Sequence, residues 1–241
     1  MATFVLVHGA FQGGWVWGRV ADLLHSRGHD VHTPTLSGCG YLAKAVHQES
    51  DLGVFIADIR SYIEFEDLGE IILIAHSFSG MVCGALMMQI PERIRQAVFV
   101  DAVIPEPQRS FADMAGEPFQ LMLEKHRGQD GAVRPWPLQV FGVTESAAAW
   151  FEPRLRPFSY KAFHTPFPGI FDPRPVPTSY ISCRETGSPF IREMAGKARR
   201  HGWSLQTINS GHCPMVTCPL ELCQAIMIQV ASGQDLLSFF Q

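Results

Sequence analysis

Ser77 occupies the position that a reactive serine takes on a turn between a strand and a helix. The apolar run from Ile71 to Ala75 predicts a strand, and the pattern that begins at Ser77 predicts a helix. Such a turn exposes the serine hydroxyl, and the residues two before and two after it must be small because strand and helix approach closely. Ala75 and Ser79 are small, although neither is the usual glycine. Ser77 is the candidate nucleophile, and a capping serine on an ordinary turn is the alternative.

A glycine-rich turn follows the first predicted strand, Phe4 to Val7, and reads H-G-A-F-Q-G-G-W. A turn at this place can present a backbone N–H to a reacting oxygen. With the N–H at the start of the helix after Ser77, it predicts an oxyanion hole formed by Ala10 and Phe78. The alternative is a flexible turn. A phosphate loop does not fit, because neither the dinucleotide glycine pattern nor a Gly-Lys-Ser/Thr element is present.

His212 is the candidate general base. It lies on a loop directly after the last predicted strand, Ser204 to Ile208, from where it can reach across to Ser77. The chain has ten histidines, and the other nine lack this placement. His76 is next to Ser77 but points the opposite way from a turn that exposes its neighbour, so it is interpreted as structural.

Apolar strands and helical patterns alternate along most of the chain and must position these residues. This rhythm predicts an α/β fold with a mostly parallel sheet flanked by helices on both faces. The prediction is one domain over 1–241, with a core of 1–103 and 178–241. Residues 104–177 interrupt the rhythm with eight Phe, two Trp and no clear strand, which predicts an inserted, partly helical cap. Strands are expected at 4–7, 30–33, 71–75, 97–101, 178–183 and 204–208, and helices at about 17–24, 52–66, 77–90, 190–200 and 219–231.

Composition excludes several classes of protein. Hydrophobic residues make up 46% of the 241 residues and charged residues 17%, with a net charge of −4. These values exclude disorder and argue against nucleic-acid binding. No run approaches the roughly 18 apolar residues of a membrane helix, and the N-terminus lacks the basic region of a signal peptide, so a cytoplasmic address is expected. The six cysteines are interpreted as free thiols, no metal is expected, and monomer and homodimer stay open.

The chain resembles the α/β-hydrolase family, in the branch of plant methylesterases, hydroxynitrile lyases and small bacterial esterases. The resemblance covers most of the chain and rests on V-L-V-H-G-A-x-x-G-G-W, A-H-S-F-S-G, D-A-x-x-P and G-H-C-P-M with a following proline. It implies that serine attacks a carbonyl, histidine takes the serine proton, a carboxylate orients the histidine, and water hydrolyses the acyl-enzyme. This chemistry needs no cofactor.

The resemblance leaves two carboxylates as partners of His212. The order serine, acid, histidine places the acid after the strand before last, where Glu185 is the only acid. Relatives commonly carry Asp about one residue later, at Thr186 here, so the longer Glu arm would compensate for a shift of register. Glu185 is the preferred acid. Asp101, at the end of the preceding strand, is the competitor, and an exposed ion pair with Arg184 is the alternative role of Glu185.

The substrate class follows from the predicted pocket. Ten Phe and Trp side chains in the cap favour an apolar or aromatic small molecule, with Gly9, Phe11, Trp136, Trp150 and Cys213 predicted in the pocket. An ester is the default scissile bond, and a carbamate, lactone or activated amide needs the same machinery. The lyase members of the branch carry threonine and lysine where this chain has Gly9 and Cys213, which disfavours lyase chemistry. A receptor that binds without turnover is the second alternative.

Overall fold

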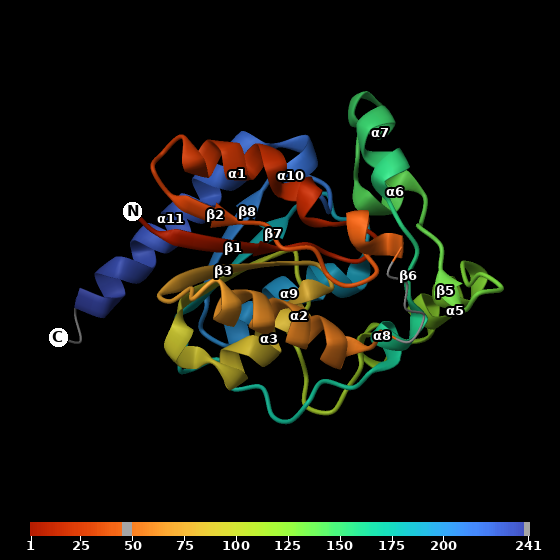
Figure 1. Cartoon of the computed structure of the whole chain (residues 1–241), viewed down its shortest axis with the longest axis horizontal. Coiled ribbons are helices and arrows are strands. Elements are labelled where there is room, and N and C mark those ends of the chain that lie inside the picture. The colour runs from red at the N-terminus through yellow and green to blue at the C-terminus, as the bar shows by residue number, and fades with distance from the viewer. Residues whose placement is uncertain (45–49, 239–241) are drawn as a thin grey trace.

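A parallel six-stranded sheet forms the centre of the molecule (Figure 1). The computed structural model describes residues 1–44 and 50–238. All five pairings in the sheet are parallel, and every residue of its third strand is buried, as expected for a sheet covered on both faces. The predicted fold class is confirmed. In sheet order, the strands are β2 (Asp30–His32), β1 (Thr3–Val7), β3 (Ile71–His76), β4 (Ile94–Val100), β7 (Thr178–Cys183) and β8 (Ser204–Ile208).

Helices cover both faces of this sheet (Figure 1). One face carries α1 (Gly18–His25), α10 (Pro214–Thr217) and α11 (Pro219–Ser238), and the other carries α2 (Leu52–Phe65), α3 (Ser79–Gln89) and α9 (Pro189–Arg200). Short 3-10 turns complete the core at η1 (Gly14–Trp17), η2 (Gly40–Lys44) and η3 (Pro91–Arg93). Helix α3 is apolar on all sides, because it lies between the sheet, α2 and the segment after β4.

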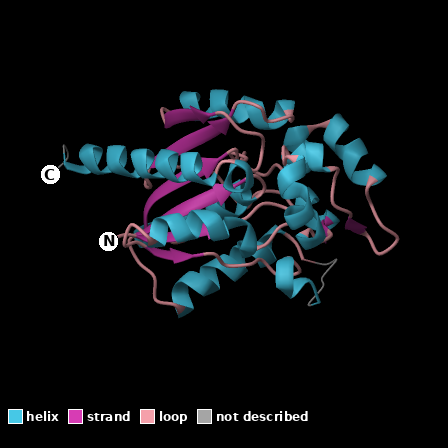
Figure 2. Cartoon of the chain, turned by 90° about the horizontal axis from the view of Figure 1, so that it is seen from above, coloured by secondary structure: helices cyan, strands magenta, loops and turns pink. Residues whose placement is uncertain are grey.

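The chain between β4 and β7 leaves the sheet and folds beyond the ends of the strands (Figure 2). We call residues 104–177 the cap, and its boundaries as a unit stay a prediction. It contains α4 (Phe111–Ala115), α5 (Glu117–Lys125), β5 (Ala132–Val133), α6 (Leu138–Phe141), α7 (Glu145–Phe151), η4 (Glu152–Arg154), β6 (Phe158–Ser159) and α8 (Tyr160–His164). The two strands pair antiparallel. Two residues per strand are too few to produce an alternating pattern, which is why the sequence showed none there.

A buried lysine anchors the start of the cap to the core. The Lys197 ammonium, on α9, donates to the carbonyl oxygens of Ile104 at 2.8 Å and Pro105 at 3.3 Å. It also contacts the Glu106 carboxylate at 2.9 Å. The first residues of the cap are therefore held against α9, close to the carboxyl end of β4.

Parallel strands bring their carboxyl ends to one edge of the sheet, and the cap lies over this edge. Ser77 follows β3 directly, Asp101 follows β4 directly, and His212 lies four residues after β8. The glycine-rich turn follows β1. Residues far apart in the sequence thus meet below the cap.

Candidate active site

Ser77 has a strained backbone on a sharp turn between β3 and α3. Its φ is +55°, in the left-handed region that residues with a side chain seldom occupy. The Ser77 carbonyl accepts from the N–H of Val103 at 3.0 Å and of Gly80 at 3.2 Å. Helix α3 begins two residues later than the sequence predicted, because Ser77 and Phe78 form this turn. The arrangement fixes the hydroxyl at the carboxyl edge of the sheet.

Ser79 and two glycines make this turn possible. The buried Ser79 hydroxyl accepts from the His76 N–H at 2.8 Å and lies 2.9 Å from the Val7 carbonyl oxygen. A Cβ on Gly80 would lie 1.9 Å from the Val103 carbonyl oxygen, and one on Gly9 would lie 2.9 Å from the Cβ of Ser77. Small residues were expected at Ala75 and Ser79 so that strand and helix can approach closely. Gly80, three residues after Ser77, also permits a close approach, here to the backbone of Val103.

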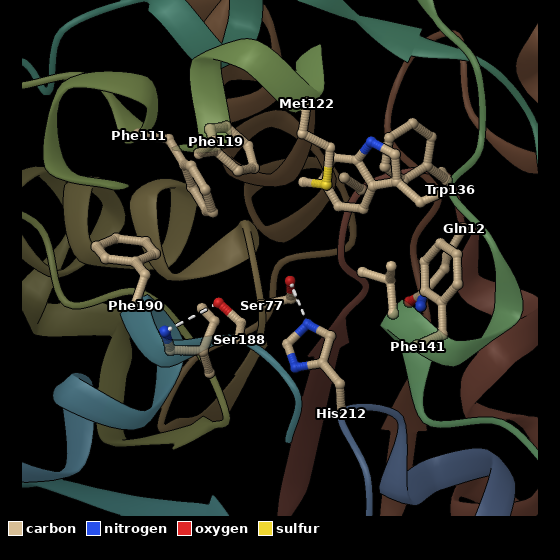
Figure 3. A pocket seen from close by; sticks show the side chains of 14 residues that line it. Gln12, Ser77, Phe111, Phe119, Met122, Trp136, Phe141, Ser188, Phe190 and His212 are labelled. Carbon is tan, nitrogen blue, oxygen red and sulfur yellow. Dashed lines mark hydrogen bonds between the residues drawn. The ribbon is translucent and has the colours of Figure 1, made fainter. Parts of the chain in front are cut away.

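Ser77, His212 and Asp101 form one chain of hydrogen bonds. His212 Nε2 lies 2.8 Å from Ser77 Oγ, and His212 Nδ1 lies 2.8 Å from Asp101 Oδ2 (Figure 3 shows the serine contact). The other Asp101 oxygen accepts from the Cys183 N–H at 3.0 Å. Asp101 is 1% exposed, so these are the contacts that hold a buried carboxylate in place.

The preference for Glu185 as the partner of His212 is wrong, and the competitor Asp101 makes the contact. Glu185 is exposed, and its backbone N–H donates to the Ser210 carbonyl. Asp101 has a φ of +45° and donates its own N–H to Ile181, in the neighbouring strand β7. This sharp turn at the end of β4 directs the carboxylate across β7 toward the histidine loop, a direction that sequence order alone does not reveal.

His76 supports the backbone of His212. Its Nε2 lies 2.7 Å from the His212 carbonyl oxygen, and because a carbonyl only accepts, this nitrogen carries the hydrogen. The two rings lie 4.9 Å apart. Burial and the neighbouring His212 lower the pKa of His76 well below its usual range, so the ring stays neutral. His76 therefore has a structural role, because this hydrogen bond holds the backbone of His212 in place.

Gln12 connects the glycine-rich turn to the histidine loop. Its side-chain oxygen accepts from the Gly9 N–H at 3.3 Å, and its amide nitrogen donates to Cys213 Sγ at 3.2 Å. Gln12 is 1% exposed. Burial raises the pKa of the Cys213 thiol, which therefore stays protonated. Gln12 could not be predicted from the sequence, since a lone glutamine in a glycine-rich turn gives no signal.

An apolar pocket of about 60 Å³ opens at Ser77 and His212 (Figure 3). Aromatic side chains from the glycine-rich turn, the cap and α9 surround it, whereas the polar groups gather at its floor. Phe11 and Trp136 lie in its wall as expected, and Ala10, predicted for the oxyanion hole, lines it too. The lining consists of Ala10, Phe11, Gln12, Ser77, Phe111, Phe119, Met122, Trp136, Val140, Phe141, Ser188, Phe190, Ile191 and His212.

Three residues predicted in the pocket lie elsewhere. Trp150 packs edge-on against Trp15, with ring centroids 5.2 Å apart, and its ring carries the guanidinium of Arg154 at 5.1 Å. It is half-buried where the cap meets the 3-10 turn at Trp15. Gly9 lies behind Ser77, where it permits close approach, and Cys213 is fully buried against Gln12. Both contact the site from behind its wall.

The histidine loop and the cap meet through a pair of glycines. A Cβ on Gly211 would lie 2.6 Å from the Cα of Gly142, at the end of α6. The Cys213 N–H donates to the Phe141 carbonyl at 3.0 Å in the same contact. The position of His212 is therefore tied to the part of the cap that carries one pocket wall.

Among the side chains that the structure describes, within 1–43 and 50–231, no three or more from His, Cys, Asp or Glu are grouped so that they could hold a metal ion. None of the helices in the same ranges is both long enough and apolar enough to cross a membrane.

This arrangement has the parts that activate a serine. A neutral His212 can accept the Ser77 proton on Nε2, and the Asp101 carboxylate at Nδ1 stabilises the resulting imidazolium and selects the required tautomer. The backbone N–H groups of Ala10 and Phe78 are the predicted donors to a developing oxyanion. Ala10 lines the pocket beside Ser77, and Phe78 is the residue that precedes α3.

Comparisons with known proteins agree with the fold. A model of the alpha/beta hydrolase family matches residues 4–225. A carbendazim hydrolyzing esterase from Nocardioides sp. (strain SG-4G) is 30% identical over 94% of this chain and 98% of its own. Polyneuridine aldehyde esterase from Rauvolfia serpentina is 34% identical, over 51% of this chain and 45% of its own length.

Solved structures show the same fold at lower identity. An extracellular α/β-hydrolase from a Paenibacillus species superposes with a TM-score of 0.81 at 22% identity, covering 95% of this chain and 98% of its own. A pyrethroid hydrolase from Sphingobium faniae JZ-2 gives a TM-score of 0.74 at 20% identity, covering 94% and 96%. Since one neighbour is described as extracellular, the cytoplasmic address stays a prediction. The family match over nearly the whole sequence shows that this chain belongs to the α/β-hydrolase family.

Proposed function

We propose that this protein is a serine hydrolase that cleaves an ester-type bond of a small apolar or aromatic substrate through an acyl-enzyme. The observation that carries the proposal is the unbroken chain of hydrogen bonds from Asp101 through His212 to Ser77 at the floor of an apolar pocket. The esterase relatives support the reaction type. The chemistry requires no cofactor, and the partner is a small molecule rather than a nucleic acid or a membrane.

Acylation uses the three side chains in a fixed order. Ser77 Oγ forms a bond to the substrate carbonyl carbon while its proton moves to His212 Nε2. The imidazolium then gives this proton to the leaving alcohol oxygen as the bond between carbon and that oxygen breaks. Asp101 stays ionised throughout and holds His212 by Nδ1–H.

Deacylation repeats these steps with water. A water molecule attacks the acyl carbon and gives one proton to His212, and the acid departs as the proton returns to Ser77. In both halves, the carbonyl oxygen becomes negative in the tetrahedral intermediate. The N–H groups of Ala10 and Phe78 are proposed to stabilise this charge, a contribution that is typically about 10² to 10³ in rate for each donor.

The pocket favours an uncharged substrate. None of its fourteen lining residues is Asp, Glu, Lys or Arg, and the walls are aromatic or aliphatic. A carboxylic ester is the first choice, and a carbamate, lactone or activated amide fits the same machinery. Gly9 and Cys213, where lyase members of the branch carry threonine and lysine, give no hydroxyl or cation for cyanohydrin cleavage.

An activity panel on wild type and Ser77→Ala tests the proposal. Esters, lactones, carbamates and cyanohydrins are assayed together, and the expected result is turnover in the first three classes that falls by several orders of magnitude in the variant. Cyanohydrin cleavage without ester hydrolysis would instead identify a lyase. Stoichiometric binding without turnover in any class would identify a receptor, and both outcomes overturn the proposal.

A further inference from the structure

A second cavity adjoins the pocket that contains Ser77. Its volume is about 440 Å³, compared with about 60 Å³ for the inner pocket. We call it the outer groove. The two spaces meet at a shared wall, and four of its five members are labelled in Figure 3. The residues that line both are Phe119, Met122, Val140, Ser188 and Phe190.

The outer groove is lined almost entirely by apolar groups. Beyond the shared wall, its lining adds Ala115, Pro118 and Gln139 from the cap and Gly187 and Pro189 from the start of α9. None of these described lining residues carries an ionisable side chain. The Ser188 hydroxyl already accepts from the Ile191 N–H at 3.3 Å. An uncharged apolar group therefore gains free energy by moving from water into this groove. A charged group would lose its hydration and find no oppositely charged partner there.

The shared wall consists of side chains that come from three separate helices. Phe119 and Met122 belong to α5, Val140 belongs to α6, and Phe190 belongs to α9. A group that extends from the inner pocket into the groove displaces only side chains, and the unbranched thioether of Met122 adapts readily to a new neighbour. Only side chains therefore separate the inner pocket from the outer groove.

We propose that the outer groove is a second substrate subsite. In this proposal, the enzyme prefers elongated, uncharged esters whose distal apolar part extends past the shared wall into the groove. The inference rests on the proposed serine hydrolase. It adds a substrate class that the inner pocket alone does not specify, because a short ester reacts at Ser77 while the groove stays unused.

Two series of esters measure the contribution of the groove. One extends the acyl chain of p-nitrophenyl esters from acetate to decanoate, and the other extends the alcohol of alkyl benzoates, both below their micelle concentrations. In wild type, kcat/KM is expected to rise by up to about fourfold per methylene in the series whose chain enters the groove. An ester with a terminal carboxylate on the same chain should lose this gain.

Two variants fill the groove without touching the inner pocket. Gly187 is exposed, has no neighbouring atom within 4 Å of the place a Cβ would take and lines only the outer groove, so Gly187→Trp adds bulk from the α9 side. Ala115→Trp adds it from the cap side. Gly69 is equally exposed and open but far from the groove, so Gly69→Trp is the matched control. The groove variants should flatten the dependence on chain length, while the control should keep the dependence seen in wild type.

Binding to the Ser77→Ala protein keeps this inference separate from the proposed reaction. Titration of that variant with the same esters should show a Kd that falls with chain length, and Gly187→Trp in this background should remove the trend. A flat length dependence in both series and in the titrations would overturn the second subsite. So would a steep dependence that survives both groove variants. Length-dependent binding without any turnover in wild type would retain the subsite and reject the hydrolase.

Discussion

Replacement of Asp101 by asparagine should remove most of the activity while the fold persists. Asp101 Oδ1 accepts from the Cys183 N–H and Oδ2 faces His212 Nδ1, so asparagine keeps its oxygen on Cys183 and turns its amide NH₂ toward the imidazole. The NH₂ group only donates, which forces the hydrogen of His212 onto Nε2. Nε2 then cannot accept the Ser77 proton. The expected loss in kcat is about 10³ to 10⁴, or about 4 to 5.5 kcal/mol of transition-state stabilisation.

Glu185→Gln is the matched control, because it makes the same chemical change at the other carboxylate near the histidine loop. Glu185 is exposed and its side chain has no role in the proposed reaction, so its rate should stay close to wild type. Both variants are assayed with a chromogenic ester, and thermal unfolding confirms that each is folded. Since asparagine retains the hydrogen bond to Cys183, the expected stability loss is about 1 kcal/mol. A folded Asp101→Asn protein with near-wild-type kcat would refute the assignment.

Three further results are expected. Burial lowers the pKa of His8 from 6.5 to about 4, so below pH 6.5 the unfolded chain binds a proton at His8 that the folded protein does not. The free energy of unfolding should therefore fall by up to about 3 kcal/mol as the pH drops from 6.5 toward 4. Urea unfolding at several pH values measures this, and a flat profile would contradict it. Gly211→Ala should lose about 1 to 3 kcal/mol of stability by overlap with Gly142, whereas Gly69→Ala, with nothing nearby, should stay within about 0.5 kcal/mol in the same assay. Gln12→Leu leaves the Gly9 N–H without its acceptor and should lower kcat about 5- to 30-fold with little change in KM, and steady-state kinetics that show only a raised KM would assign Gln12 to binding instead.

The elements around Ser77 were predictable from the sequence because each carries a local signal. Apolar strands that alternate with helices predict a mostly parallel sheet, and the small residues beside Ser77 predict the turn. The place of His212 after the last strand also follows from chain order. Local pattern and global fold agree at these positions.

The identity of the acid was not predictable in the same way. Asp101 and Glu185 both follow strands at the correct edge of the sheet, and what separates them is the left-handed backbone of Asp101, which directs its carboxylate across β7. When the residue is not glycine, its sequence gives no reliable sign that it adopts a positive φ. The position of Trp150 was also not predictable. The cap holds ten Phe and Trp side chains, and only their packing decides which of them line the pocket.

The most direct test of the central claim is covalent labelling of the serine. Wild type and Ser77→Ala are treated with a fluorophosphonate probe, digested and analysed by mass spectrometry for the modified peptide. The account predicts one labelled residue, Ser77, with labelling abolished in the variant and activity lost in proportion to labelling in wild type. Labelling at another residue, or retained activity in a fully modified protein, would contradict it.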